Sequence, residues 1–126
     1  MNFEKGWNPF MEYNGIEVQS VSTEKSVLCA TIGKNSENPY GMIHGGLICT
    51  MIDCVAGITA RADGNPYVTQ DSYVNFLSNS AEEERIYAES DVIRRGKTIV
   101  AVHVRVYTPG GKDLADGIVN MFRIES

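Results

Sequence analysis

The sequence lacks the residue patterns that mark several large classes of protein. It contains only three cysteines, Cys29, Cys49 and Cys54, and none of them forms a CxxC pair, which favours reduced thiols over a disulfide framework. Its two histidines, His44 and His103, do not have the spacing of a zinc site, and no GxxxxGKS/T phosphate loop is present. We therefore expect no bound metal and no cofactor.

Positive charge and long apolar runs are also scarce. The chain has 11 Lys and Arg residues against 16 Asp and Glu residues, and its net charge of −5 argues against a surface for nucleic acid or anionic membranes. The longest apolar segment, Gly45 to Ala60, is interrupted by Asp53 and is too short to span a bilayer. The mixed, polar N-terminus does not have the layout of a signal peptide. These absences predict a cytoplasmic protein that binds neither nucleic acid nor membrane.

What is present predicts a single domain. A length of 126 residues with 43% hydrophobic content is enough for one core but too little for two. Residues 1–14, with Trp7 and Met11 among polar residues, are expected to form an N-terminal extension, a short amphipathic helix or coil that packs on the body. The run Ile16 to Ile32 indicates a first long strand or a hairpin, and Gly33 to Gly41 is expected to be a loop because it is dense in turn-forming residues.

One long segment has helical periodicity. Between His44 and about Ala62, apolar residues recur at helical spacing, and the turn residues from Asp63 to Pro66 end the pattern. The recurring residues are Leu47, Met51, Val55 and Ile58, with Ile48 and Ile52 beside them. Because these side chains occupy most of the helix circumference, we expect the helix to be mostly buried.

Four strand-like segments follow the helix, joined by short turns. They are Tyr67–Ser78, Arg85–Arg95, Thr98–Thr108 and Leu114–Ile124. In the third of them, valines at positions 100, 102, 104 and 106 alternate with less apolar residues, which is typical of a half-buried strand. The predicted fold is α+β, a single domain in which an antiparallel meander of consecutive strands wraps around one long central helix.

Asp53 is unusual because it is a carboxylate in the middle of this apolar helix. An acid in such a place is costly unless it is paired, hydrogen-bonded or wet. The helical face through Asp53 otherwise carries the small residues Cys49, Gly57 and Ala60, and Gly57 costs the helix about 1 kcal/mol relative to alanine. Asp53 either bonds a neighbouring group or acts on a ligand that approaches this face.

The start of the helix is the second unusual place. Gly45 and Gly46 follow His44, and two glycines in the first turn leave backbone N–H groups uncovered at the positive end of the helix dipole. Such amides can stabilise developing negative charge, for example the oxyanion of an acyl transfer. The simpler interpretation is that the glycines permit a tight turn from the loop into the helix.

The residues at these two places resemble a known family. The run Asn38 to Gly46 (NPYGMIHGG), with Asp53 seven residues after Gly46, is similar to the signature of the hotdog-fold acyl-CoA thioesterases, in particular the branch that includes the phenylacetate-pathway (PaaI-like) enzymes. The segments Thr69–Asp71, Asn75–Ser78 and Arg94–Thr98 also resemble this family, and the likeness covers residues 15–124. One departure is the run Asn79-Ser80-Ala81, where the family usually has a proline.

The resemblance implies a hotdog domain that hydrolyses an acyl- or aryl-acyl-CoA to the free acid and coenzyme A. The Gly45 backbone amide would donate to the thioester carbonyl oxygen, and Asp53 would be the nucleophile or general base. Asn38 would lie near the thioester or position the attacking water, and Thr69 would orient that water or Asp53. The resemblance leaves open whether water attacks the thioester directly or an anhydride forms first.

Several further residues are expected to contact the substrate. His44 would mainly shape the start of the helix through a side-chain hydrogen bond. His44 secondarily, and Gly46, would bind substrate. A basic turn formed by Arg94, Arg95, Gly96 and Lys97 stands out in an acidic protein and could hold the phosphates of coenzyme A. A solvated end of a hairpin explains the same residues equally well.

Helix geometry predicts a homodimer. Gly45 and Asp53 are eight residues apart in the sequence, so about 12 Å separates them along the helix axis. One carbonyl cannot lie at bonding distance from both groups of the same chain. If both act in one site, they come from two antiparallel helices of a two-fold dimer, and a homotetramer of such dimers is also expected. The alternative functions are a hotdog dehydratase or hydratase of 3-hydroxyacyl thioesters and a non-catalytic acyl-CoA-binding protein.

Overall fold

The computed structural model describes residues 8–124 of the chain. In chain order its elements are α1 (Pro9–Tyr13), β1 (Ile16–Ser20), β2 (Val27–Thr31), the short 3-10 helix η1 (Lys34–Ser36), α2 (Gly45–Arg61), β3 (Tyr67–Phe76), β4 (Arg85–Arg95), β5 (Ile99–Tyr107) and β6 (Asp113–Arg123). The predicted central helix is α2. The segment Ile16–Ile32 is a hairpin, β1 with β2, which is one of the two forms that the sequence allowed.

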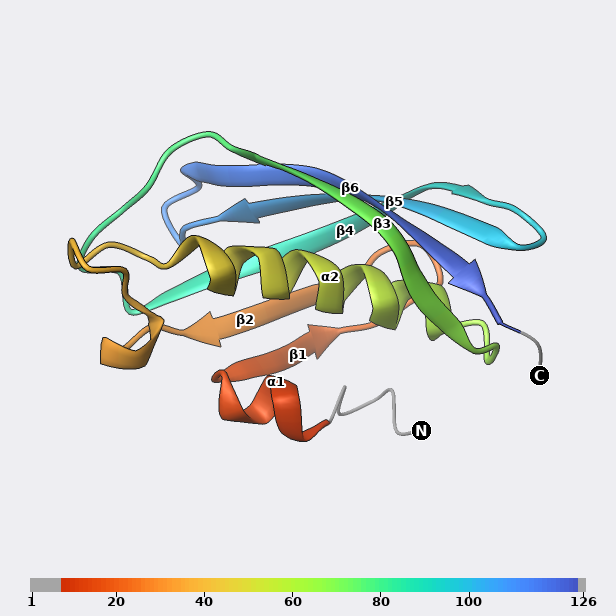
Figure 1. The fold of residues 1–126 in the computed structure, drawn as a ribbon, viewed down its shortest axis with the longest axis horizontal. Coiled ribbons are helices and arrows are strands. Elements are labelled where there is room, and N and C mark those ends of the chain that lie inside the picture. Colours follow the sequence, from red (N-terminus) through yellow and green to blue (C-terminus); the bar gives the residue numbers. More distant parts are fainter. Residues whose placement is uncertain (1–7, 125–126) are drawn as a thin grey trace.

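The strands form one antiparallel sheet in the order β1-β2-β4-β5-β6-β3. The sheet curves around α2, which lies along its inner face (Figure 1). The predicted α+β architecture with one central helix is therefore confirmed. Among the described residues, no helix is long and apolar enough to cross a membrane.

The meander prediction is wrong for β3. Strands β4, β5 and β6 are consecutive neighbours, but β3 pairs with β6 along its whole length and has no other partner strand in the part of the chain that the structure describes. The chain must cross from β3 at one edge to β4 in the middle of the sheet, through residues 77–84. Local hydrophobic patterns do not encode which strands pair, so the sequence did not reveal this crossing.

The core lies between the sheet and α2. The alternation expected for β5 is confirmed, because its valines at positions 100, 102, 104 and 106 are fully buried. These side chains pack with the apolar residues of α2, of which Met51, Ile52 and Val55 are also fully buried. The remaining side of α2, at Cys49 and Asp53, is exposed in the single chain. The helix is therefore mostly buried, as expected, with an exposed strip at Cys49 and Asp53.

The N-terminal helix α1 closes one edge of the sheet beside β1. Asn8 caps it by accepting a hydrogen bond from the backbone N–H of Met11, and Pro9 occupies its first turn, where no N–H is needed. Met11 is only 2% exposed, so this helix packs on the body as predicted, although Phe10 and Tyr13 face solvent. Trp7, which was expected to contribute to the same packing, lies outside the described residues.

Candidate active site

The loop that leads into α2 is held in a defined shape by its own hydrogen bonds. The side-chain oxygen Oδ1 of Asn38 accepts the backbone N–H groups of Tyr40 (2.9 Å) and Met42 (3.1 Å), and the backbone N–H of Asn38 donates to the Met42 carbonyl (2.8 Å). Because Oδ1 is used inside the loop, the amide NH₂ of Asn38 points away from these backbone groups and keeps its donors for another partner.

The first turn of α2 leaves one backbone amide without an acceptor. The side chain of His44 caps the helix, since its Nδ1 accepts the N–H of Gly46 at 2.8 Å. The N–H groups of Leu47 and Ile48 donate to the His44 carbonyl. Within the described chain, only Gly45 of these four residues donates to nothing. The expectation of two uncovered glycine amides is therefore corrected, because His44 occupies the amide of Gly46.

An aromatic ring stands beside this free amide. Phe76, the last residue of β3, has two ring carbons 3.4 Å from the point where a side chain on Gly45 would begin. Phe76 is 53% exposed, so the rest of its ring is available to a ligand. The sequence placed Phe76 in the family-like run Asn75–Ser78 but gave it no role at the site. Seven residues separate it from Thr69, and simple alternation puts the two side chains on opposite faces. A β-bulge between Thr69 and Asp71 shifts the alternation by one residue and brings both to the helix side.

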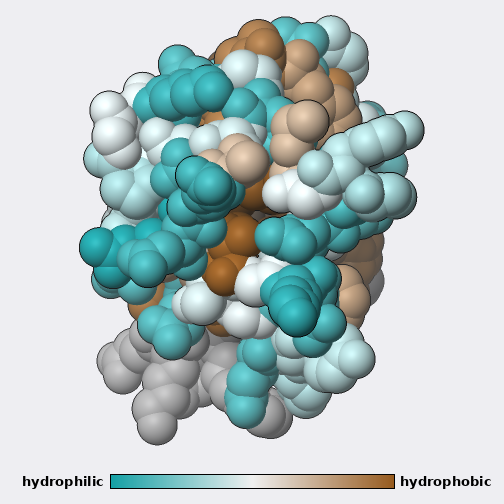
Figure 2. All heavy atoms as spheres, turned by 90° about the vertical axis from the view of Figure 1, so that its left-hand side faces the viewer, coloured by the Kyte–Doolittle hydropathy of each residue, from teal (hydrophilic) through white to brown (hydrophobic). Residues whose placement is uncertain are grey.

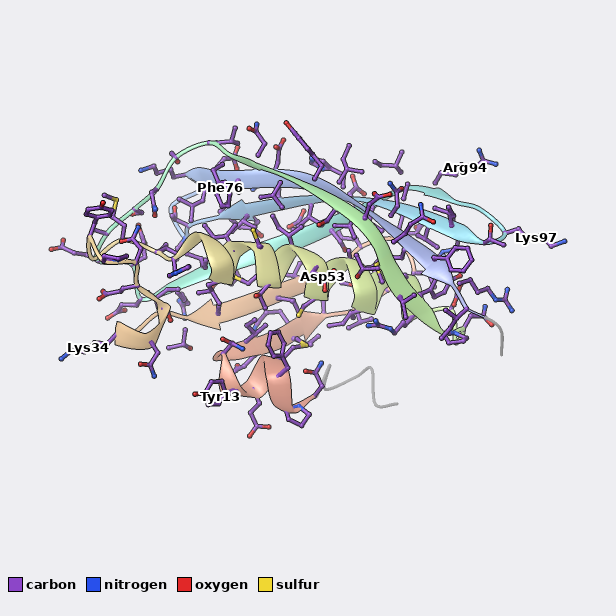
Figure 3. All side chains as sticks on the ribbon, viewed as in Figure 1. Tyr13, Lys34, Asp53, Phe76, Arg94 and Lys97 are labelled. Atoms are coloured by element: carbon purple, nitrogen blue, oxygen red, sulfur yellow. The ribbon has the colours of Figure 1, made fainter. Side chains whose placement is uncertain are left out.

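Asp53 is hydrogen-bonded to Thr69. The Thr69 hydroxyl donates to Oδ1 of Asp53 at 2.6 Å, and both residues are exposed in the single chain. The second carboxylate oxygen, Oδ2, has no partner within residues 8–124 and can accept a proton or a hydrogen bond. Figure 3 shows Asp53 near the middle of α2, with Phe76 above the N-terminal end of the same helix. Gly45 and Asp53 are thus at separate places on one helix.

The basic turn does not act as one cluster. Arg95 lies on the helix side of the sheet, where its guanidinium donates to the carbonyls of Thr59 (2.9 Å), Ala60 (3.0 Å) and Thr23 (2.7 Å) and pairs with Asp63 at 2.7 Å. These contacts supply acceptors for most of its donors and stabilise the C-terminal end of α2, where free carbonyls need partners.

The other two cations of the turn, Arg94 and Lys97, form no ion pair within residues 8–124. Arg94 alternates with Arg95 along β4 and is exposed on the opposite face, and Lys97 is exposed at the turn itself. Both lie toward the end of the molecule where α2 terminates, away from Phe76 (Figure 3). The structure does not bring Arg94, Gly96 or Lys97 into contact with Asp53, and their binding of phosphates stays a prediction. No group of His, Cys, Asp and Glu side chains within residues 8–124 could hold a metal ion.

Comparison with known proteins identifies the family. Residues 40–115, more than half of the chain, match the Thioesterase superfamily. The chain belongs to this superfamily. Acyl-coenzyme A thioesterase 13 of Mus musculus is 25% identical over 105 residues, which are 81% of this chain and 75% of the mouse protein. The superfamily match and this relative support thioester hydrolase activity for the chain.

Solved structures show the same fold. The PaaI protein from the phenylacetic acid degradation operon of E. coli superposes with a TM-score of 0.90 at 18% identity, over 94% of this chain and 86% of that protein. A hypothetical thioesterase protein from Streptococcus pneumoniae TIGR4, solved with coenzyme A, has a TM-score of 0.82 at 22% identity, over 88% of this chain and 87% of the other. Two further structures of the S. pneumoniae protein carry alanine in place of an aspartate and of a threonine. The hotdog fold predicted for this superfamily member is confirmed.

Proposed function

We propose that this thioesterase hydrolyses acyl-CoA thioesters at a site that combines Asp53 of one chain with the Gly45 amide of a second chain. One observation carries the proposal. On the same helix, the structure has an exposed carboxylate with a free oxygen and a free backbone N–H, about 12 Å apart along the axis. These are the two groups that thioester hydrolysis needs, and a single carbonyl can reach both only across a dimer interface.

The chemistry follows from the contacts of each group. The thioester carbonyl oxygen accepts the Gly45 N–H, so the negative charge of the tetrahedral intermediate develops at the positive end of α2. Asp53 takes a proton from water through Oδ2 while the water oxygen attacks the carbonyl carbon. The thiolate of coenzyme A then leaves and receives that proton. In the alternative route, Asp53 attacks the carbonyl carbon itself, the thiolate leaves, and water hydrolyses the resulting anhydride.

Thr69 and Asn38 are proposed to support this step. The Thr69 hydroxyl holds Oδ1 of Asp53, which leaves Oδ2 directed to the substrate. The free amide NH₂ of Asn38, fixed by the two loop hydrogen bonds to its oxygen, is a donor for the thioester or the attacking water. An aspartate and a threonine are also the residue types that were replaced by alanine in the hypothetical thioesterase protein of S. pneumoniae, which agrees with a role for this pair.

The dimer is supported by what the single chain leaves uncovered. Strand β3 is a ten-residue edge strand whose side chains are nearly all exposed, including Val68, Tyr73 and Phe76. A long exposed edge strand with apolar side chains among its residues invites pairing with another strand. A second copy that covers β3 would also cover Asp53 and Thr69, which lie beside it, so the interface and the active site would form together. A homotetramer of these dimers and a cytoplasmic location stay predictions.

The two ends of the substrate are proposed to bind at opposite ends of α2 within one chain. Apolar and aromatic side chains surround the start of the helix, namely Tyr40, Met42, Phe76 and Leu77, each at least 38% exposed. Figure 2 looks onto this end and shows apolar surface between hydrophilic side chains. Arg94 and Lys97, at the other end, have no carboxylate partner within the described residues and are proposed to bind the phosphates of coenzyme A.

Replacement of the carboxylate tests the proposed catalyst. Asp53→Asn keeps the size of the side chain and its hydrogen bond from Thr69, but removes the proton acceptor. We expect a folded, assembled protein whose kcat for an acyl-CoA is lower by about 10² to 10⁴, measured by thiol release. A near wild-type kcat in this variant would falsify the assignment of Asp53. Formation of an enoyl thioester from a 3-hydroxyacyl thioester would instead indicate a dehydratase.

Mixing of two inactive variants tests the shared site. Asp53→Asn and Gly45→Val each remove one half of the site, since a valine at position 45 would crowd the Phe76 ring and displace the amide donor. After subunit exchange, random pairing makes about half of the dimers mixed, and each mixed dimer has one intact site, so activity should return to about a quarter of wild type. If exchange is shown with labelled subunits and activity stays at the level of the parents, Asp53 and Gly45 do not serve one carbonyl from two chains.

A further inference from the structure

The glycine in the middle of α2 makes room for an arginine. A side chain added at Gly57 would begin 2.7 Å from the Nη1 atom of Arg61 and 3.3 Å from its Cζ and Nη2 atoms. The guanidinium of Arg61 therefore folds back over Gly57 by one helical turn, toward the N-terminus of α2. This contact explains why a glycine is present where alanine would favour the helix by about 1 kcal/mol.

Arg61 is held in this orientation but is not neutralised. Its Nε donates to the backbone carbonyl of Tyr67 at 3.2 Å, which fixes the plane of the guanidinium. No carboxylate of the described chain lies within ion-pair distance of Arg61, and its two terminal nitrogens have no hydrogen-bond acceptor in residues 8–124. The two terminal nitrogens of Arg61 therefore carry four N–H donors in the fixed planar geometry of the guanidinium, hereafter the fork, which suits oxygen acceptors.

The position of this fork relates it to the proposed active site. Asp53 and Gly57 are one turn apart on the same face of α2, so the guanidinium lies about 6 Å from the catalytic carboxylate along the axis. It is displaced toward the C-terminal end of the helix. The β4–β5 turn is at this same end, because Arg95 bonds the last carbonyls of α2.

We propose that Arg61 donates hydrogen bonds to the amide carbonyl oxygens of the pantetheine arm of coenzyme A. This inference rests on the proposed function. With the thioester at Asp53 and the phosphates at the β4–β5 turn, the arm between sulfur and phosphates runs along α2 past Gly57. The arm carries two amide groups, whose carbonyls match the donors of a guanidinium, whereas an apolar acyl chain would leave those donors unpaired. Arg61 thus selects thioesters that carry this arm.

A comparison of leaving groups tests the proposal. Arg61→Met keeps an unbranched side chain over Gly57 but removes the donors. We measure kcat/KM with one acyl group attached to coenzyme A, to pantetheine and to ethanethiol. The loss of hydrogen bonds from a charged donor predicts a decrease of about 10-fold to 100-fold for the first two substrates. The ethyl thioester, which has no amide, should change by less than about two-fold.

Two matched variants complete the experiment. Gly57→Ala displaces the flexible end of Arg61 without removing it, so it should reproduce the arm-dependent loss while the melting temperature stays constant or rises. Arg85→Met removes an exposed positive charge at the start of β4 and should leave all three substrates unaffected. The contrast separates a positional effect of Arg61 from a general loss of charge or stability.

Each other outcome overturns the assignment. An equal decrease for all three thioesters means that Arg61 acts on the fold or on Asp53, and no decrease means that it does not contact substrate. A decrease for coenzyme A alone means that Arg61 binds phosphate. If wild type hydrolyses no thioester, the proposed function fails separately, and calorimetry of pantetheine binding decides about Arg61. Binding that Arg61→Met does not weaken by about tenfold or more then refutes the proposal.

Discussion

The proposed shared site fixes which residues of two α2 helices face each other. If Gly45 of one chain lies opposite Asp53 of its partner, the helices are antiparallel, and the position midway between them, Cys49, lies at the two-fold axis. Cys49 is exposed in the single chain, on the same side of α2 as Asp53. The two Cys49 thiols of a dimer should therefore face each other between the two active sites.

Helix geometry gives the expected distance between these cysteines. Packed helices have axes about 8–10 Å apart, and each Cα lies about 2.3 Å from its axis, so facing Cα atoms are about 3–5 Å apart. A disulfide accepts Cα separations of about 4.4–6.8 Å, which overlaps the upper part of that range. Oxidation should therefore join two chains through a disulfide between their Cys49 residues. Where bound substrate moves the helices further apart, a short bis-maleimide cross-linker should join the same two thiols.

The assay is a non-reducing gel of the oxidised or cross-linked protein. Wild type should give a band of twice the chain mass, which Cys49→Ser abolishes and Cys29→Ser or Cys54→Ser leaves unchanged. Burial, and after it the negative charge of Asp53, raises the pKa of the Cys54 thiol to about 11, so Cys54 reacts slowly near neutral pH. A dimer band that survives Cys49→Ser, or no band under either treatment in a protein shown to be dimeric, refutes the antiparallel register.

Three further predictions concern other parts of the chain. Thr69→Val should lower kcat by about 10-fold, because the charged carboxylate of Asp53 loses a hydrogen bond, whereas Thr69→Ser should retain activity. Equal steady-state rates for the two variants would contradict this role of Thr69. Charge reversal at Arg94 and Lys97 should raise KM for acyl-CoA at low salt and have less effect at high salt, and a salt-independent KM would remove them from the site. Partial burial raises the pKa of Asp63, but hydrogen bonds from neighbouring groups and the charge of Arg95 lower it below 3.8 overall. This stabilisation is present at neutral pH and is lost as the pH falls from 3.8 through the folded pKa, so the difference in melting temperature between wild type and Asp63→Asn should narrow on acidification.

The sequence was sufficient where a structural feature depends on nearby residues. The helical period between His44 and Ala62, ended by turn residues, predicted α2 to within one or two residues, and the valine alternation predicted the buried face of β5. The hydrogen bond of His44 at the start of α2 was also expected, because a side chain beside a helix N-terminus has unpaired amides within reach. These features involve contacts over a few residues, which a pattern can encode.

The sequence was insufficient where a contact joins distant segments. The pairing of β3 with β6 depends on closing the sheet around α2, and no local pattern distinguishes it from a simple meander. Arg95 shared a motif with Arg94 and Lys97, but its place on the helix side of β4 directs it to the carbonyls at the end of α2. Arg61 carried no signal of its own, although the cost of Gly57 in a helix indicated that some group gains from the missing side chain.

The parts that remain exposed in the single chain connect the fold to its assembly. Asp53 and Thr69 lie beside the edge strand β3, where the described sheet ends and α2 is uncovered. An open edge strand costs stability and invites aggregation, while an exposed carboxylate in water is a weaker catalyst than one that is shielded. Association through this side would correct both deficits, since it pairs the edge and brings the Gly45 amide of a second chain to Asp53. On dilution, activity should therefore be lost at the same protein concentration at which the dimer dissociates. At no concentration should the dimer be inactive or the monomer active.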